Sequence, residues 1–395
     1  MQPSSKTTLA STLFEKLASS LDLSRGRSGK SISAMEGLRG VAVVMVFLVH
    51  YAVFVEPWIV GADYGPAVLQ ALIINFNAGV DLFFIMSGYL IYGMLIGKKT
   101  DYGVYAGRRL RRIYPTFFAV FLLYVLIFLA MPSQSKLPAG IGEAATFLLI
   151  NAALLPGMLP MEPMISVAWS LSFEVFFYLT VPFTIPLFRP LKPRNRIMLL
   201  YAASAVLLAL SYLNDNHQWV RAVMFFSGMI LYEQVKAGTR GLLSGTAAVL
   251  VAAIASLLLF AMPDSNGSYI TRIVILFVVY RWLCLACFTA KDGTASTLFN
   301  HYPLRWLGNM SYSFYLIHNI SVKVFFLILA KLIAPTGNQP LVFIGAFIPC
   351  FVFALIVSYL LFLCVEKPLS LAPAHPLQSP EEGKRVGESA SATAE

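Results

Sequence analysis

Long apolar stretches separated by short polar ones run through the chain from residue 38 to residue 364. A helix of about 20 apolar residues crosses the hydrocarbon core of a bilayer, and the stretches lack the alternating pattern of a membrane barrel. The pattern therefore predicts an all-α fold, a polytopic transmembrane helix bundle. About ten spans are expected, at residues 38–57, 77–97, 113–131, 167–188, 197–213, 218–234, 242–262, 270–290, 310–331 and 341–364.

The basic residues of the loops predict the orientation of the bundle, because cytoplasmic loops carry an excess of Lys and Arg. They follow the second, fourth, sixth and eighth spans: Lys98, Lys99, Arg108, Arg109, Arg111, Arg112, Arg189, Lys192, Arg194, Arg196, Lys236, Arg240, Lys291 and Arg305. Ten spans place all these loops, and both termini, in the cytoplasm. This holds only if the apolar stretch 142–160, broken by Asn151, Pro156 and Pro160, does not cross the membrane. We predict that it re-enters the membrane or lies on its surface.

Polar sequence flanks the predicted membrane domain on both sides. Residues 1–33 are expected to form a cytoplasmic N-terminal segment, and residues 34–370 the transmembrane domain. Residues 371–395 are rich in Pro, Glu, Ser and Ala, a composition that predicts a disordered cytoplasmic tail.

Composition supports a membrane protein and removes other function classes. Of 395 residues, 58% are hydrophobic and only 12% are charged. The net charge of +10 follows from the basic loops, and no nucleic-acid-binding motif accompanies it, so no nucleic-acid partner is predicted. Cys284 and Cys287 form a C-x-x-C pair without a second pair or a histidine cluster, so no metal is predicted.

An arginine and a histidine share the first span. Arg39 and His50 are eleven positions apart, which is about 16 Å along an α-helix. With Arg39 at the cytoplasmic surface, His50 lies deep in the membrane. An ionisable side chain is costly there and marks a functional site.

The arginines that begin the third span form a candidate anion site. Arg109 and Arg112 are three residues apart and share a helix face, close to Pro115 in an early turn. Paired guanidinium groups at a helix N-terminus suit the binding of phosphate. Anchoring to anionic lipid is the competing explanation, and spacing alone slightly favours it. Arg39 at the same membrane face favours a shared anion site.

Asp81 lies near the outer end of the second span, at the depth expected for His50. A carboxylate bound to an imidazole fixes its tautomer and stabilises the imidazolium form. A polar pair that merely joins two helices explains both residues equally well. Gly79 and Gly88 predict that the helix approaches its neighbours closely.

Polar side chains in two later spans predict a wet cavity. Ser170 and Glu174 are four residues apart and lie on one helix face. Ser311, Tyr315 and His318 form a second stripe. Structural hydrogen bonding is the commoner role for each residue alone, but together they indicate an interior lined by polar groups.

These segments resemble motifs of the membrane-bound acyltransferase 3 family, whose members O-acylate sugars and other small acceptors. Arg39 and His50 match the family's Arg-x10-His signature, with Glu36 where Asp is usual. The other matching segments are Gly79–Gly88 (Phe-Phe-x-x-Ser-Gly), Arg109–Pro115 (Arg-x-x-Arg), Trp169–Glu174 (Trp-Ser-Leu-x-x-Glu), Ser311–His318 and Glu366–Pro368.

The resemblance implies an acyl-CoA donor, usually acetyl-CoA, that enters from the cytoplasmic side of the bacterial inner (plasma) membrane. It implies that His50 is essential, and that Arg39, Arg109 and Arg112 bind the donor. A carbohydrate or lipid-linked glycan is the implied acceptor. With it we predict the catalytic residues His50, Asp81 and Glu174, and the acceptor-binding residues Ser87, Ser170, Tyr315 and His318.

Two other function classes fit the residues. A transporter or flippase also has many helices and intramembrane ionisable groups, and a membrane sensor could keep the fold without the chemistry. Labelled acetyl-CoA distinguishes a transporter from an enzyme, because an enzyme labels its acceptor and a transporter moves its substrate unmodified. The presence of Arg39, His50, Arg109 and Arg112 argues against the sensor.

Overall fold

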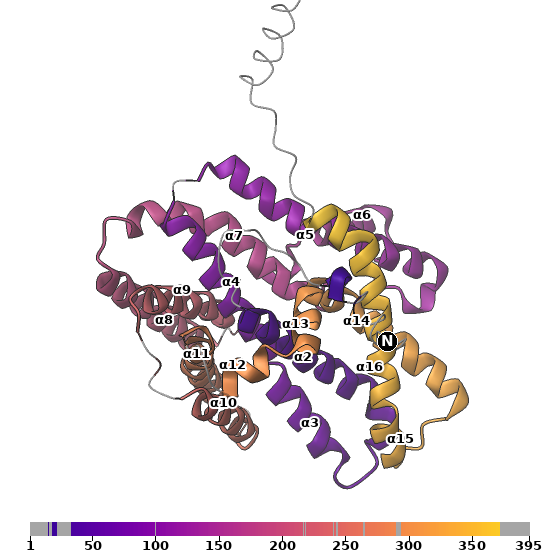
Figure 1. Cartoon of the computed structure of the whole chain (residues 1–395). Coiled ribbons are helices and arrows are strands. Elements are labelled where there is room, and N and C mark those ends of the chain that lie inside the picture. The colour runs from indigo at the N-terminus through magenta and orange to yellow at the C-terminus, as the bar shows by residue number, and fades with distance from the viewer. Residues whose placement is uncertain are drawn as a thin grey trace, which may run out of the picture.

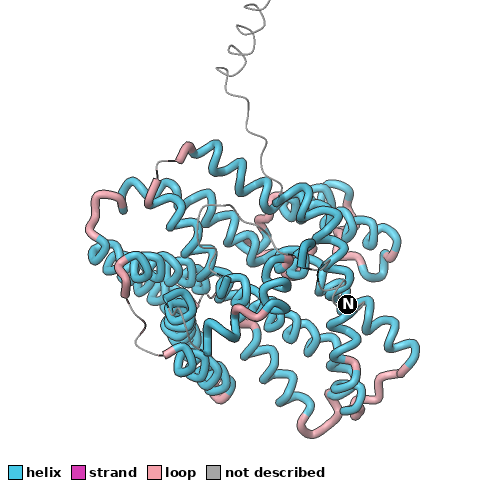
Figure 2. Tube along the Cα trace, viewed as in Figure 1, coloured by secondary structure: helices cyan, strands magenta, loops and turns pink. Residues whose placement is uncertain are grey.

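The computed structural model describes residues 15, 18–21, 33–98, 100–215, 217, 219–239, 241, 244–263, 265–289 and 294–371. Helices joined by short loops make up almost all of these residues, and no strand occurs among them (Figure 2). The predicted all-α bundle is therefore confirmed. Most of the predicted N-terminal segment, and the predicted tail beyond residue 371, lie outside the described residues.

In chain order the helices are α2 (Ser33–Ile59), α3 (Gly65–Phe76), α4 (Gly79–Ile96), α5 (Tyr102–Ala130), η1 (Pro132–Gln134), α6 (Ile141–Ala152), η2 (Pro156–Met158), α7 (Ala168–Phe188), α8 (Pro193–Leu213), η3 (Val220–Ala222), α9 (Val223–Lys236), α10 (Gly245–Phe260), α11 (Asn266–Thr289), α12 (Thr294–Phe299), α13 (Tyr302–Asn309), α14 (Ser311–Leu332), α15 (Pro340–Gly345), α16 (Phe347–Leu361) and the π-helix η4 (Phe362–Leu371).

Each predicted span falls on a helix. Among the described residues, eight helical stretches are long and apolar enough to cross a membrane, and each overlaps one predicted span. The spans predicted at 218–234 and 242–262 fall on α9 and α10, which have 14 and 16 residues. The number of crossings and the side on which the termini lie therefore stay predictions.

The broken apolar stretch 142–160 forms the short helix α6 and the turn η2. Helix α6 has 12 residues, which gives a length of about 18 Å, less than a hydrocarbon core of about 30 Å. Leu154 follows with a φ of 56° and a buried side chain, where the chain turns back toward α7. This agrees with the prediction that the stretch does not span.

Helix α2 lies at the centre of the bundle and contacts α3, α4, α13 and α14, with α8–α11 on one side and α14–α16 on the other (Figure 1). Glycines allow its closest approach. A Cβ at Gly37 would lie 1.8 Å from the carbonyl oxygen of Phe299, and one at Gly40 would lie 2.1 Å from that of Leu304. This packing brings Arg39 of α2 to the start of α14.

Helices α4 and α9 also cross at glycines. A Cβ at Gly88 would lie 2.2 Å from the carbonyl oxygen of Phe225, and one at Gly228 would lie 2.0 Å from that of Ile85. Gly79 packs on α2, where a Cβ would lie 2.7 Å from the carbonyl oxygen of Ala42. The close packing predicted at Gly79 and Gly88 is therefore confirmed, and it fixes the helix that carries Asp81 and Ser87.

Candidate functional site

A cavity of about 150 Å³ lies between α2, α4, α5, α7 and α14. Its wall combines three guanidinium groups, one carboxylate and several hydroxyls with apolar side chains. Seven of the ten predicted site residues line it: Arg39, Ser87, Arg109, Arg112, Ser170, Glu174 and Tyr315. The structure thus brings together residues that lie up to 276 positions apart in the sequence, from Arg39 to Tyr315.

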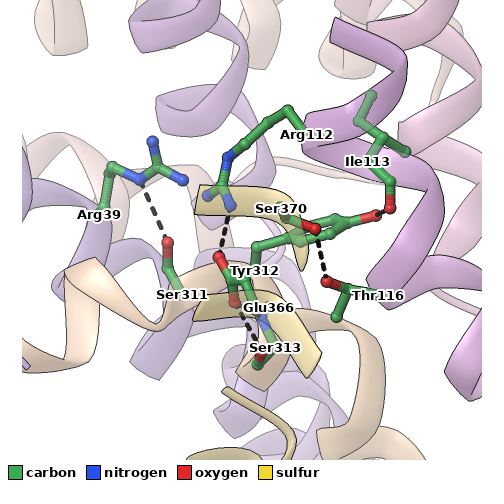
Figure 3. Close-up of polar contacts among 9 residues, drawn as sticks. All are labelled: Arg39, Arg112, Ile113, Thr116, Ser311, Tyr312, Ser313, Glu366 and Ser370. Atoms are coloured by element: carbon green, nitrogen blue, oxygen red, sulfur yellow. Dashed lines mark hydrogen bonds and ion pairs between the residues drawn. The ribbon is translucent and has the colours of Figure 1, made fainter. Parts of the chain in front are cut away.

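Arg39 and Arg112 both line this cavity, and their guanidinium groups lie close together (Figure 3). The Nε of Arg39 donates a hydrogen bond to Ser311 Oγ at 3.2 Å. The Nη1 of Arg112 forms an ion pair with Glu366 Oε1 at 2.6 Å. Two adjacent guanidinium groups with one buried carboxylate, bound to Arg112, leave an excess of positive charge, which suits an anionic ligand.

Arg109 supplies the third guanidinium group. Its Cζ lies 5.9 Å from the ring centroids of both Tyr105 and Tyr178, in cation–π contact. Within the described part of the chain it forms no ion pair, and its buried Nε has no hydrogen-bond partner. It is therefore free to pair with a bound anion.

Glu174 and four hydroxyl groups form the other polar part of the wall. Glu174 Oε1 accepts hydrogen bonds from Ser87 Oγ, at 2.7 Å, and from the hydroxyl of Tyr178. The hydroxyls of Ser170 and Tyr315 share a hydrogen bond of 2.6 Å. This mixture of carboxylate and hydroxyl groups suits a ligand that carries hydroxyls of its own.

His50 and His318 lie next to each other, beyond the residues that line the cavity. Their ring centroids are 5.0 Å apart, and the ring of His318 is 6.0 Å from that of Tyr315 in the cavity wall. In the described part of the chain, no cluster of three or more His, Cys, Asp or Glu side chains could hold a metal ion. The two histidine rings therefore form a separate pair, which contacts the cavity wall at Tyr315.

The tautomer of His318 follows from its surroundings. Its Nδ1 lies 2.9 Å from the carbonyl oxygen of Phe314, which can only accept, so Nδ1 carries the proton. Nε2 of the neutral ring is then a lone pair, and it is buried without a partner among the described residues. His318 therefore presents an unused hydrogen-bond acceptor close to His50.

The predicted pairing of Asp81 with His50 is wrong. Asp81 Oδ2 lies 3.5 Å from Arg221 Nη2, and neither carboxylate oxygen has a hydrogen-bond partner in the described residues. Arg221 also packs over the ring of Trp169, 5.8 Å from its centroid. The crossing of α4 and α9 explains this pairing, because it brings η3, which precedes α9, beside the start of α4. A catalytic role for Asp81 stays a prediction.

Three residues in or beside the site received no predicted role, although the sequence carries a signal for each. Arg221 lies at the end of a span that the positive-inside rule predicts to be outside the cytoplasm, where an arginine is unexpected. Glu366 is a carboxylate in an apolar stretch, which predicts a buried partner. Tyr178 follows Glu174 by four residues and so shares its helix face.

Comparison with known proteins identifies the class. The family model described as an acyltransferase domain, that of acyltransferase 3, matches residues 32–363. The chain therefore belongs to the acyltransferase 3 family, which confirms the resemblance seen in its motifs and the prediction of an acyltransferase.

Among its relatives, the chain is 29% identical over 198 residues to "O-acetyltransferase OatA" of Staphylococcus aureus (strain NCTC 8325 / PS 47), covering 46% of this chain and 30% of the relative. It is 24% identical over 319 residues to "Acyltransferase MdmB" of Streptomyces mycarofaciens, and the match covers 74% of this chain and 79% of that relative. It is 24% identical over 330 residues to "Peptidoglycan O-acetyltransferase OatA" of Listeria monocytogenes, and the match covers 74% of this chain and 49% of that relative. The chain thus spans less than a third of the first of these relatives. No solved structure shows a significant match.

Proposed function

We propose that the chain is an integral membrane O-acyltransferase of the bacterial inner membrane. It moves an acyl group, in the first instance acetyl, from cytoplasmic acyl-CoA to a hydroxyl of a carbohydrate or cell-surface glycan. The observation that carries the proposal is the convergence of Arg39, Arg109 and Arg112 on one cavity, from which α2 leads to His50. Membership of the acyltransferase 3 family, and relatives named as O-acetyltransferases, support it.

The three arginines are the proposed binding site for the phosphates of the donor. Guanidinium groups form bidentate hydrogen bonds with phosphate oxygens, and Arg109 has no carboxylate partner among the described residues to give up. The cavity of about 150 Å³ is smaller than the 300–1,000 Å³ typical of pockets for drug-sized ligands. It accommodates part of acyl-CoA, so binding of the whole donor requires the surrounding helices to move apart.

The distance from Arg39 to His50 suits the length of the donor. The two residues lie on the unbroken helix α2, about 16 Å apart along its axis. With the phosphates at Arg39, the extended pantetheine arm carries the thioester toward His50. The surrounding helices keep the thioester away from bulk water.

In the proposed reaction His50 acts as general base on the acceptor hydroxyl. It takes the hydroxyl proton as the oxygen attacks the thioester carbonyl, the new C–O bond forms and the C–S bond breaks. The leaving CoA thiolate then takes the proton from His50. His318, with its free Nε2 beside His50, orients the base or the acceptor. Glu174, Ser87, Ser170 and Tyr315 bind the acceptor.

The test is acyl transfer from radiolabelled acetyl-CoA in membranes that contain matched amounts of wild type, His50→Ala or His217→Ala. His217 lies in the loop after α8, beside the ring of Tyr269, and serves as the matched control. Labelled glycan is expected with wild type and His217→Ala and is expected to be absent with His50→Ala. Undiminished transfer by His50→Ala, or movement of a substrate without labelling, would overturn the proposal.

A further inference from the structure

Glu366 is a fully buried carboxylate whose two oxygens are both engaged (Figure 3). Oε1 accepts from Arg112 Nη1 at 2.6 Å. Oε2 accepts from the backbone N–H of Ser313 at 2.9 Å and from its Oγ at 2.6 Å. It comes from η4, more than 320 residues after Arg39, so the last of the described helices contributes to the arginine cluster.

The contact with Ser313 makes Glu366 a cap for α14. Ser313 lies in the first turn of α14, which begins at Ser311, and N–H groups of a first turn have no partner within the helix. A carboxylate there is stabilised by the helix dipole as well as by the hydrogen bond. Glu366 thus has a fixed position, set by the helix whose first residue binds Arg39.

Glu366 lies behind Arg112 as seen from the cavity. Arg112 lines the cavity, whereas Glu366 is not among the lining residues. The exposed fraction of the side chain is 21% for Arg112 and 0% for Glu366. A ligand in the cavity therefore meets Arg112 without competing for the place that Glu366 occupies.

The face of the same guanidinium group is held by an aromatic ring. Arg112 Cζ lies 5.4 Å from the ring centroid of Tyr312, and the Tyr312 hydroxyl donates to the carbonyl oxygen of Ile113 at 2.8 Å. The guanidinium group of Arg112 thus has one edge on Glu366 and one face on Tyr312. Its remaining N–H groups can donate hydrogen bonds to a ligand in the cavity.

We infer that Glu366 is a positioning residue for anion binding, which holds the guanidinium group of Arg112 in the cavity wall. Without a buried counter-charge, the long arginine side chain would turn toward water and leave the cavity. The inference rests on the proposed function in one respect, namely that the anion is a phosphate group of acyl-CoA.

The direction in which Glu366→Gln changes the Kd for acetyl-CoA separates a positioning role from a simple effect of charge. Glu366→Gln keeps an oxygen that can cap Ser313 but removes the negative charge. If Arg112 stayed in place, the cluster would be more positive and would bind an anion more tightly. We expect the opposite, because Arg112 loses its position. The Kd for acetyl-CoA should rise about tenfold, with kcat changed less than twofold.

The experiment measures the Kd for labelled acetyl-CoA, together with KM and kcat, on the full chain purified in detergent. Ser370→Ala is the control, because it breaks the 3.2 Å contact between Ser370 and Thr116 that also joins η4 to α5, but leaves Arg112 and Glu366 intact. It should leave the Kd unchanged. Arg112→Ala is the reference for the donor site and should itself weaken binding.

In the Arg112→Ala background, adding Glu366→Gln should change the Kd less than twofold, since the residue it positions is gone. The comparison of Arg112→Ala with the double variant also tests the positioning role if the single Glu366→Gln protein does not fold. Tighter binding by either Glu366→Gln protein than by its parent, or equal weakening by Ser370→Ala, would overturn the positioning role. If Arg112→Ala itself leaves acetyl-CoA binding intact, the proposed donor site fails instead.

Discussion

The two ends of the proposed site are built on different principles. The arginine end, made of Arg39, Arg112 and Glu366 with Arg109 nearby, is rich in polar partners supplied by α2, α5, α14 and η4. The histidine end, made of His50 and His318, is held mainly by ring contacts, such as the one between Phe314 and His318 with centroids 5.6 Å apart.

The difference teaches how each end is suited to its task. Positive charges inside a membrane protein need a counter-charge or polar partners, and at the arginine end Glu366 pairs with Arg112 while Ser311 accepts from Arg39. An imidazole that exchanges protons needs a free nitrogen, and an apolar setting that leaves it neutral in the resting state. The first end is suited to hold a charged group, and the second to carry out chemistry.

The largest effect is expected from His50→Ala. General-base catalysis contributes about 10²–10⁴-fold to a rate, so kcat for acyl transfer should fall about a thousandfold. Single-turnover kinetics with labelled acetyl-CoA would measure it. A fall in donor affinity with an unchanged rate would show that the two ends do not divide the work as proposed.

Asp81→Asn tests whether the histidine end depends on a carboxylate. Because Arg221 would lose its buried counter-charge, we expect a loss of about 3–5 kcal/mol in unfolding free energy. The transfer rate per folded molecule should stay within about threefold. The double variant Asp81→Leu with Arg221→Met should recover most of the stability. A large loss of rate at full stability would restore the predicted catalytic role of Asp81.

Gly228→Ala tests how far the cavity depends on helix packing. A Cβ there would lie 2.0 Å from the carbonyl oxygen of Ile85, and overpacking of this kind costs about 1–3 kcal/mol. Gly107→Ala on α5 is the control, because a Cβ there meets nothing within 4 Å, and stability should rise by about 0.5–1 kcal/mol. Unfolding titrations in mixed micelles would compare them, and equal stability of the two variants would contradict this packing.

The smallest effect on this scale is expected from Arg109→Ala. It removes one phosphate contact but leaves no carboxylate unpaired, so KM for acetyl-CoA should rise about tenfold, or about 1.4 kcal/mol, with kcat nearly unchanged. Arg109→Lys keeps the charge but loses the planar fork and should give a smaller rise. If both variants lowered kcat and left KM alone, Arg109 would belong to the chemistry.

The fold could be predicted from the sequence because apolar length is a local property. All ten predicted spans overlap helices of the described residues, and the interrupted stretch at 142–160 forms a helix of only 12 residues. The cavity residues Arg109, Arg112, Ser170 and Glu174 could be grouped because their spacings place each pair on one face of a helix.

The partners of these residues could not be predicted, because they depend on which helices cross. Asp81 pairs with Arg221 since the glycine contact between α4 and α9 brings η3 beside it. Glu366 reaches Arg112 through a π-helix at the end of the described residues. No local pattern in the sequence gives the position of that helix relative to α5.

The central claim is that donor binding and chemistry are separate, with phosphates at the arginines and acyl transfer at His50. It is tested most directly by equilibrium binding of labelled acetyl-CoA to His50→Ala, which should bind the donor without turning it over. We predict a Kd within twofold of wild type, weakened about tenfold when Arg109→Ala is added. Loss of acetyl-CoA binding in His50→Ala, or binding that is insensitive to Arg109, would contradict the account.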